Sequence, residues 1–170
     1  HGISFEDSSI AENAEGTIRM EGIGNIGVLI NNSTIIGDTV SIEGSGFDVN
    51  GAGVRLGESV LEFSSANIRG DSESSYGIHI VTPDMTTIDT TDCNLILNGT
   101  AQIAEEEIHV DDDWSLDLLS CSMIVESSLY AQRIDILGNS ESEFVSHKPM
   151  WFSGKVNFKL FGSTTIHNGF

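Results

Sequence analysis

The chain contains, at residues 53–70, the stretch GVRLGESVLEFSSANIRG, and imperfect copies of this stretch lie on both sides of it. The glycines that open the copies stand at positions 27, 53 and 77, so successive copies are 26 and 24 residues apart. Gly2 has the same phase, 25 residues before Gly27. A repeat of this length indicates a solenoid, in which each repeat forms one coil and stacks on the next.

Each repeat contains three short runs in which apolar and polar residues alternate. In the quoted stretch the first run carries Val54 and Leu56, and Gly, Asn, Ser and Asp separate the runs. Alternation at period two is typical of strands, and no run of helical length keeps a period of 3.6. A leucine-rich repeat has a similar period but needs a consensus that is absent here. We therefore expect an all-β parallel β-helix with five to six coils of about 25 residues and three short strands per coil.

The length and composition favour a single domain. The chain has 170 residues, of which 39% are hydrophobic, and this suits a thin continuous core. We expect regular coils over residues 2–102 and irregular coils over residues 103–170, where the repeat spacing is lost. Because the chain begins His1-Gly2 without a Met, we expect an excised piece of a longer protein. The longest apolar runs are only a few residues, so no membrane insertion is predicted.

The charge is strongly acidic, with 26 Asp and Glu against 7 Lys and Arg and a net charge of −19. So few cations cannot replace the counterions released from a nucleic acid backbone, and we exclude DNA and RNA as partners. All the acids fall in residues 1–143. Two interpretations remain open, namely solubility of a long exposed rod and binding of a specific partner.

The sequence carries no convincing motif for catalysis or for a cofactor. Residues 22–27, GIGNIG, match the dinucleotide fingerprint G-x-G-x-x-G, but that fingerprint requires a helix after it. Here Gly22 closes one coil and Gly27 opens the next, so the match predicts a coil corner. A nucleophile elbow and a phosphate loop are also missing from the sequence. We therefore predict neither an enzyme nor a cofactor.

The chain has two cysteines, Cys93 and Cys121. Cys93 lies four residues before Leu97, and Cys121 lies four residues before Val125, which closes the following coil. This phase predicts that the two cysteines are neighbours in one ladder of the helix. They form either a pair of buried thiols or a disulfide between adjacent coils, and both remain open at this point.

A cluster of acids with a nearby tryptophan stands in the irregular part. Like charges at one coil spacing repel by about 1 kcal/mol in water, so a partner or a cation would relieve the cluster. It is either a docking surface, a calcium site or a solvated loop, although no calcium-loop motif occurs. Trp114 is either a binding anchor or a cap over the core. The hypothetical receptor-binding residues are Glu105, Glu106, Glu107, Asp111, Asp112, Asp113, Trp114 and Trp151.

Two histidines occupy the same strand position in successive coils. His79 and His109 point outward if their neighbours Ile78 and Ile108 point inward. Two stacked imidazoles are potential metal ligands, but a zinc site needs at least a third protein ligand. None occurs at that phase, so no metal site is predicted.

The repeats resemble a known family. Gly-Val-x-Leu, Ser-x-Leu and Ile-x-Gly-x-Ser follow one another in residues 53–72 and more loosely in residues 27–46. This succession is similar to the filamentous-haemagglutinin-type repeats of two-partner-secreted exoproteins, which include adhesins and contact-dependent growth inhibition effectors of Gram-negative bacteria. The resemblance covers about residues 2–100. It implies a right-handed β-helical filament on the cell surface, and in the effectors a segment among such repeats binds an outer-membrane receptor while a toxin domain lies far downstream.

Three classes of function are consistent with these observations. We favour a non-catalytic binding segment in which residues 103–170 recognise a protein or glycan receptor on another bacterium or on a host cell. A structural β-helical stalk without its own ligand is the first alternative. A polysaccharide lyase or hydrolase is the second, although few Arg or Lys are available to bind substrate carboxylates. As a fragment, the chain is expected to be monomeric.

Overall fold

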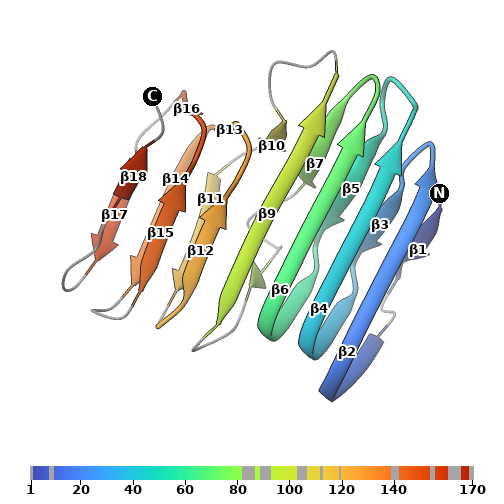
Figure 1. The fold of residues 1–170 in the computed structure, drawn as a ribbon, viewed down its shortest axis with the longest axis horizontal. Coiled ribbons are helices and arrows are strands. Elements are labelled where there is room, and N and C mark those ends of the chain that lie inside the picture. Colours follow the sequence, from blue (N-terminus) through green and yellow to red (C-terminus); the bar gives the residue numbers. More distant parts are fainter. Residues whose placement is uncertain are drawn as a thin grey trace.

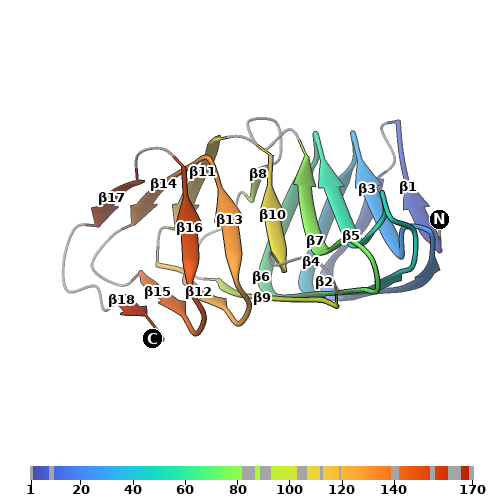
Figure 2. The same ribbon diagram turned by 90° about the horizontal axis from the view of Figure 1, so that it is seen from above.

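The computed structural model confirms the all-β parallel β-helix. It describes residues 2–7, 10–81, 87–88, 93–102, 107–111, 113–118, 120–138, 142–153, 156–160 and 166–168. Strands in these ranges pair in parallel and wind into a rod, with β1 and β2 at one end and β16 to β18 at the other (Figures 1 and 2). None of the described residues forms a helix long and apolar enough to span a membrane.

Sheet A forms one face of the rod and receives one strand from each coil. Its seven parallel strands, in spatial order, are β1 (Ile3–Phe5), β3 (Val28–Asn31), β5 (Ala52–Gly57), β7 (Tyr76–Val81), β10 (Ile108–Val110), β13 (Leu129–Ala131) and β16 (Met150–Phe152). Successive strands are 25, 26 and 24 residues apart as far as β7, then 30, and 21 after that. The number of coils is thus slightly larger than expected, because the later coils are shorter.

Sheet B and sheet C form the rest of the wall. The strands of sheet B are β2 (Ile10–Gly24), β4 (Thr34–Gly46), β6 (Val60–Ser72), β8 (Thr87–Ile88), β9 (Asn94–Ala101), β12 (Ser122–Val125), β15 (Glu143–Ser146) and β18 (Ile166–Asn168). Sheet C contains β11 (Asp113–Leu118), β14 (Arg133–Gly138) and β17 (Val156–Leu160). Figure 2 shows sheet A on the near side of the rod, with sheet C behind it and sheet B along the lower edge.

The early coils contain two strands each, where the sequence pattern predicted three. The second and third predicted runs merge into the single long strands β4 and β6. The pair Gly37–Phe63 and the next pair, Thr39–Ser65, keep the same register, so both strands turn the corner without leaving the sheet. Three separate strands per coil are found further along, where β10, β11 and β12 follow one another.

The core is a set of apolar ladders inside the rod. In sheet A one ladder consists of fully buried side chains from successive coils, namely Val28, Val54, Ile78, Ile108 and Leu129. Side chains alternate between the two faces of a strand, so every second residue of sheet A faces outward. Each buried aliphatic side chain contributes about 1.5–3 kcal/mol, which makes the sheet a rigid support for the outward residues.

The glycine motif at residues 22–27 is a coil corner, as predicted. Gly22 belongs to β2, and the chain enters strand β3 directly after Gly27. A Cβ atom on Gly22 would overlap the carbonyl oxygen of Gly27. The glycines are therefore required by the close crossing of the two strands and not by a phosphate group.

Candidate functional site

The outward residues of sheet A form a continuous row, which we call the outer row. Pairing between neighbouring strands places Arg55 beside His79, His79 beside His109, His109 beside Tyr130, and Tyr130 beside Trp151. Neighbouring strands are about 4.8 Å apart, so one side chain follows another at that interval along the rod. The outer row thus consists of one guanidinium and four rings from five successive coils.

Ring stacking orders the middle of the outer row. The ring of His109 stacks on Tyr130 with centroids 5.2 Å apart and planes 8° apart. It also stacks on Tyr76, at the start of β7, with centroids 4.3 Å apart and planes 11° apart. Because β10 lies between β7 and β13 in sheet A, His109 is held between two tyrosines. Such stacked contacts favour a single ring orientation.

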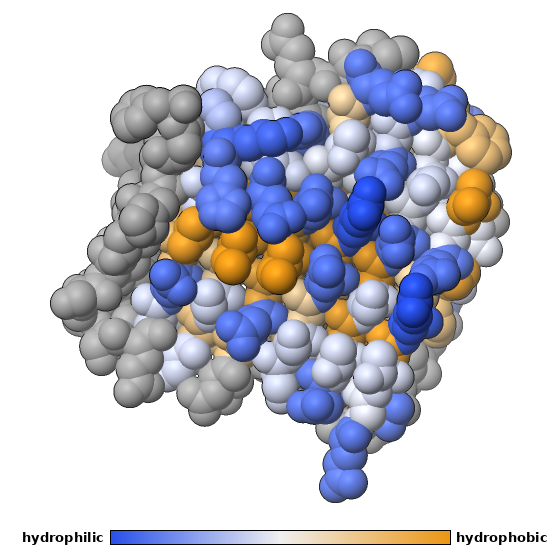
Figure 3. Space-filling model, viewed as in Figure 1, coloured by the Kyte–Doolittle hydropathy of each residue, from blue (hydrophilic) through white to orange (hydrophobic). Residues whose placement is uncertain are grey.

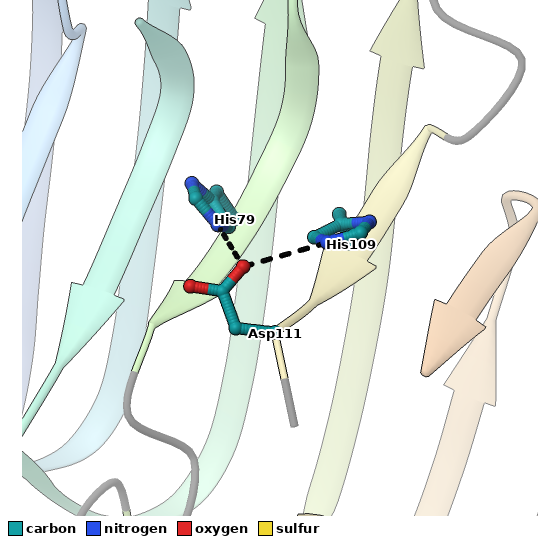
Figure 4. A group of neighbouring side chains, drawn as sticks. All are labelled: His79, His109 and Asp111. Carbon is teal, nitrogen blue, oxygen red and sulfur yellow. Dashed lines mark hydrogen bonds and ion pairs between the residues drawn. The ribbon is translucent and has the colours of Figure 1, made fainter. Parts of the chain in front are cut away.

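His79, His109 and Asp111 converge beside these stacked rings (Figure 4). The Nε2 atom of His79 lies 2.7 Å from Asp111 Oδ1, where the imidazole donates to the carboxylate. The Nε2 atom of His109 lies 3.4 Å from the same oxygen. The side chains of His79 and His109 are 17% and 16% exposed and that of Asp111 is 36% exposed, so the cluster opens to solvent on the carboxylate side.

The two histidines do have a third potential ligand, which corrects the argument from sequence. That argument required a ligand at the same strand position in another coil. Asp111 instead lies two residues after His109, on the same side of the chain, and its backbone N–H donates to the carbonyl of Ile80. The donor atoms of His79, His109 and Asp111 all lie within 4.8 Å of one another.

Burial controls the protonation of His79. Removal of the imidazole from water lowers the pKa of His79 below its ordinary value, although the hydrogen bond to Asp111 acts in the opposite direction. The positive charge of Arg55 adds to the lowering. The neutral imidazole, which is the form that binds metal ions, is therefore favoured.

The predicted acidic cluster is only partly described. Glu105, Glu106 and Asp112 lie outside the described residues, and Asp113 is the first residue of β11. Asp111 belongs to the histidine cluster described above. The six acids are therefore not shown to form one surface.

Glu107 is held by contacts within the fold. Its carboxylate lies 2.7 Å from the ammonium group of Lys148, two coils further on, and accepts a hydrogen bond from the backbone N–H of Ser128 at 2.8 Å. Burial alone would raise the pKa of Glu107, but the hydrogen bonds from Lys148 and Ser128 hold it below its ordinary value. The side chain is 17% exposed, so Glu107 connects coils and offers little surface to a receptor.

The two tryptophans occupy opposite environments. Trp114 is 1% exposed and packs in the hydrophobic core, so the expectation of an exposed binding anchor is wrong for this residue. Its position at the start of β11 turns the side chain inward, as in the alternative of a cap over the core. Trp151 is 47% exposed at the end of the outer row, where it remains a candidate for binding.

Cys93 and Cys121 are neighbours, as their phase predicts, and they form a disulfide. Their Cα atoms lie 4.4 Å apart, immediately before the paired strands β9 and β12. Both side chains are buried. Of the two alternatives that the sequence left open, the disulfide is the one observed, and neither thiol is available for chemistry.

The outer face of sheet B has a different character. Figure 3 shows apolar side chains in the middle of this face and hydrophilic side chains on either side of them. Ile96, Ile124 and Val145 are paired across β9, β12 and β15, and each is partly exposed. Larger exposed apolar residues, Ile23 and Phe47, lie near the other end of the rod. No titratable cluster accompanies them among the described residues.

Sequence reasoning missed Tyr76 and Tyr130 and the participation of Asp111. The outer row follows from register, since Tyr130 is one coil after His109, and shorter coils obscured that step. The sequence His109-Val110-Asp111 contains a usable signal, because residues two apart on a strand project to the same side. No family model, curated protein or solved structure matches this chain.

Proposed function

We propose that this chain is a non-catalytic binding segment of a large bacterial surface exoprotein and recognises a receptor on a target cell. The observation that carries the proposal is the outer row on sheet A, which ends in the exposed ring of Trp151. The parallel β-helix and the repeat pattern of residues 27–72 support placement in an exoprotein of a Gram-negative cell surface. The receptor is a protein or a glycan of that surface.

The outer row has physical features that suit recognition. Its side chains stand on strands whose inward neighbours are fully buried, so the backbone needs no reorganisation when a partner binds. The stacked rings of His109 and Tyr130 are already ordered, which reduces the entropy that binding removes. Exposed tryptophan is the residue type that most often supplies the central contact of an interface.

The charge of the chain supports a role in steering. With a net charge of −19, the rod attracts basic surfaces over distances comparable to the Debye length. Asp111, 36% exposed, places a carboxylate next to the rings of the outer row. The proposed binding face therefore combines long-range attraction with a short-range aromatic contact.

A cell-binding measurement tests the proposed function. Labelled wild-type chain is titrated onto a panel of Gram-negative cells at low and moderate salt, beside Trp151→Ser and the control Phe47→Ser. Phe47 is 52% exposed and Trp151 is 47% exposed, but Phe47 lies in the turn between β4 and β5, away from the outer row. We expect saturable binding that Trp151→Ser weakens about thirtyfold and Phe47→Ser leaves unchanged.

Two results would contradict the proposal. Equal binding of wild type and Trp151→Ser would remove the outer row as the recognition face. Absence of binding to every cell type by a folded chain would favour the structural stalk, in which the rod only spaces other parts of the exoprotein.

A further inference from the structure

The backbone brings two imidazoles together and keeps them there. His79 on β7 and His109 on β10 are directly paired, and the pairs on either side of them are Ile78–Ile108 and Ile80–Val110. All four of these flanking aliphatic residues are 0–1% exposed, so the register of the two histidines is fixed by the core. A parallel pair at this spacing holds two side chains about 4.8 Å apart at their backbones.

The donor atoms already approach the separations of a metal site. Two ligand atoms that each lie about 2.0–2.1 Å from Zn²⁺ at a tetrahedral angle are about 3.3–3.4 Å apart. His109 Nε2 and Asp111 Oδ1 are separated by 3.4 Å. His79 Nε2 is 2.7 Å from the same oxygen, and a small rotation of the exposed carboxylate would open that distance.

The type of donor selects the class of ion. Ca²⁺ and Mg²⁺ prefer six or more oxygen ligands, which this cluster does not supply. Two imidazole nitrogens and one carboxylate oxygen suit Zn²⁺ and its divalent transition-metal neighbours. Three protein ligands leave a fourth position for water or for an exogenous group.

The surroundings orient the ligands. Tyr76 and Tyr130 hold the ring of His109, so little side-chain freedom would be lost on coordination. Arg55 is the cation that acts on His79 and opposes a bound metal, whereas the Asp111 carboxylate and the negative charge of the rod favour one.

From this geometry we propose that His79, His109 and Asp111 form a binding site for one divalent transition-metal ion, with Zn²⁺ as the ion of best fit. The site goes beyond the receptor-binding function proposed above and does not depend on it. Metal binding is measured without cells, so failure of either proposal is recognised separately.

Zinc affinity of the full chain tests the site. The chain is treated with chelator, freed of the chelator, and titrated with Zn²⁺ against a chromophoric competitor in the presence of excess Ca²⁺, which occupies weak carboxylate sites. We expect one ion per chain with a dissociation constant below about 100 μM. Co²⁺ bound in place of Zn²⁺ should give the visible absorption of a four-coordinate ion.

Matched variants assign the ligands. His79→Gln, His109→Gln and Asp111→Asn keep side chains of similar size that still form hydrogen bonds, and each should weaken Zn²⁺ binding at least about tenfold. His147→Gln replaces an exposed histidine outside the cluster and should leave the affinity unchanged. Circular dichroism and the urea midpoint establish that each variant is folded.

The proposal is overturned by Zn²⁺ affinity weaker than the stated limit in the wild type. It is also overturned if the three variants, once shown to be folded, bind Zn²⁺ as tightly as the wild type. The Co²⁺ spectrum gives an independent reading on the wild type, since an octahedral spectrum would show that the ion is held by scattered surface carboxylates.

Discussion

At the scale of single residues, Trp114 shows how a side chain next to an acidic run can belong to the core. It is among the largest fully buried side chains, and its indole Nε1 has no hydrogen-bond partner among the described residues. An unpaired buried N–H retains a desolvation cost of about 1–3 kcal/mol. The packing of the ring must exceed that cost.

The first prediction concerns the two parts of this balance. Trp114→Ala should lower the free energy of unfolding by about 3–5 kcal/mol because it leaves a cavity. Trp114→Phe should lower it by less than about 2 kcal/mol, because the lost packing is offset by removal of the unpaired N–H. Urea unfolding followed by circular dichroism measures both. Equal, small effects of the two substitutions would show that the side chain is not buried.

At the scale of strands, the crossing between coils depends on glycine. A Cβ atom on Gly44 in β4 would overlap the carbonyl oxygen of Gly53, which opens the next coil. Both groups belong to the backbone, so neither can move without breaking ladder hydrogen bonds. Gly37, in the same strand, is different, because the nearest atoms to an added Cβ are side-chain carbons of Ile18 and Val40 at 3.3 Å.

The second prediction compares these two positions. Gly44→Ala should lower the free energy of unfolding by about 3 kcal/mol or more, since the backbone at the crossing has to separate. Gly37→Ala should change it by less than about 1 kcal/mol, because flexible side chains can shift and the unfolded chain loses entropy. Chemical denaturation of the two variants in parallel decides the matter. Comparable losses for both would mean that the crossing has no special requirement for glycine.

The third prediction concerns the bond between neighbouring coils. Cys93 and Cys121 close a loop of 28 residues, and the chain-entropy model assigns such a cross-link about 3–4 kcal/mol. The double substitution Cys93→Ala and Cys121→Ala should therefore lower the free energy of unfolding by about 2–4 kcal/mol. Thiol titration of the denatured wild type should find free thiols only after reduction. Reactive thiols before reduction would contradict the disulfide.

At the scale of the whole molecule, acidic charge is spread along a rod with few counter-charges. Glu21 and Glu43 are directly opposed on neighbouring strands of sheet B, where like charges are unfavourable. Ion pairs such as Arg69–Asp71 are exposed and contribute little. Repulsion therefore outweighs attraction over the surface, and the folded rod is expected to be sensitive to ionic strength.

The fourth prediction follows from this imbalance. An increase in NaCl from about 0.01 M to about 0.3 M shortens the Debye length from about 30 Å to below 10 Å. The thermal midpoint should rise by a few degrees, since screening weakens repulsion in the compact state more than in the unfolded chain. Sucrose, which adds no charge, serves to separate screening from solvent exclusion. A midpoint that falls with NaCl would show that attractive pairs dominate.

The fold class and several neighbours could be predicted because a β-helix repeats one local rule. The spacing of 24–26 residues, the alternation at period two and the glycine corners all follow from residues near each other in sequence. Cys93 and Cys121, like His79 and His109, were placed side by side from phase alone, and the register agrees. This succeeds because each strand pairs with the equivalent strand one coil away.

Only the tertiary structure decided what occurs at the corners and between coils of unequal length. Coils of 30 and 21 residues place Tyr130 over His109 and Lys148 beside Glu107, and no constant period gives those contacts. The inward turn of Trp114 depends on where β11 begins. The sequence by itself therefore determined the parallel β-helix and its cysteine pair, because strand alternation and coil period are local properties. The ring stack and the His79–His109–Asp111 cluster required the fold, because they depend on how the chain leaves one strand and enters the next.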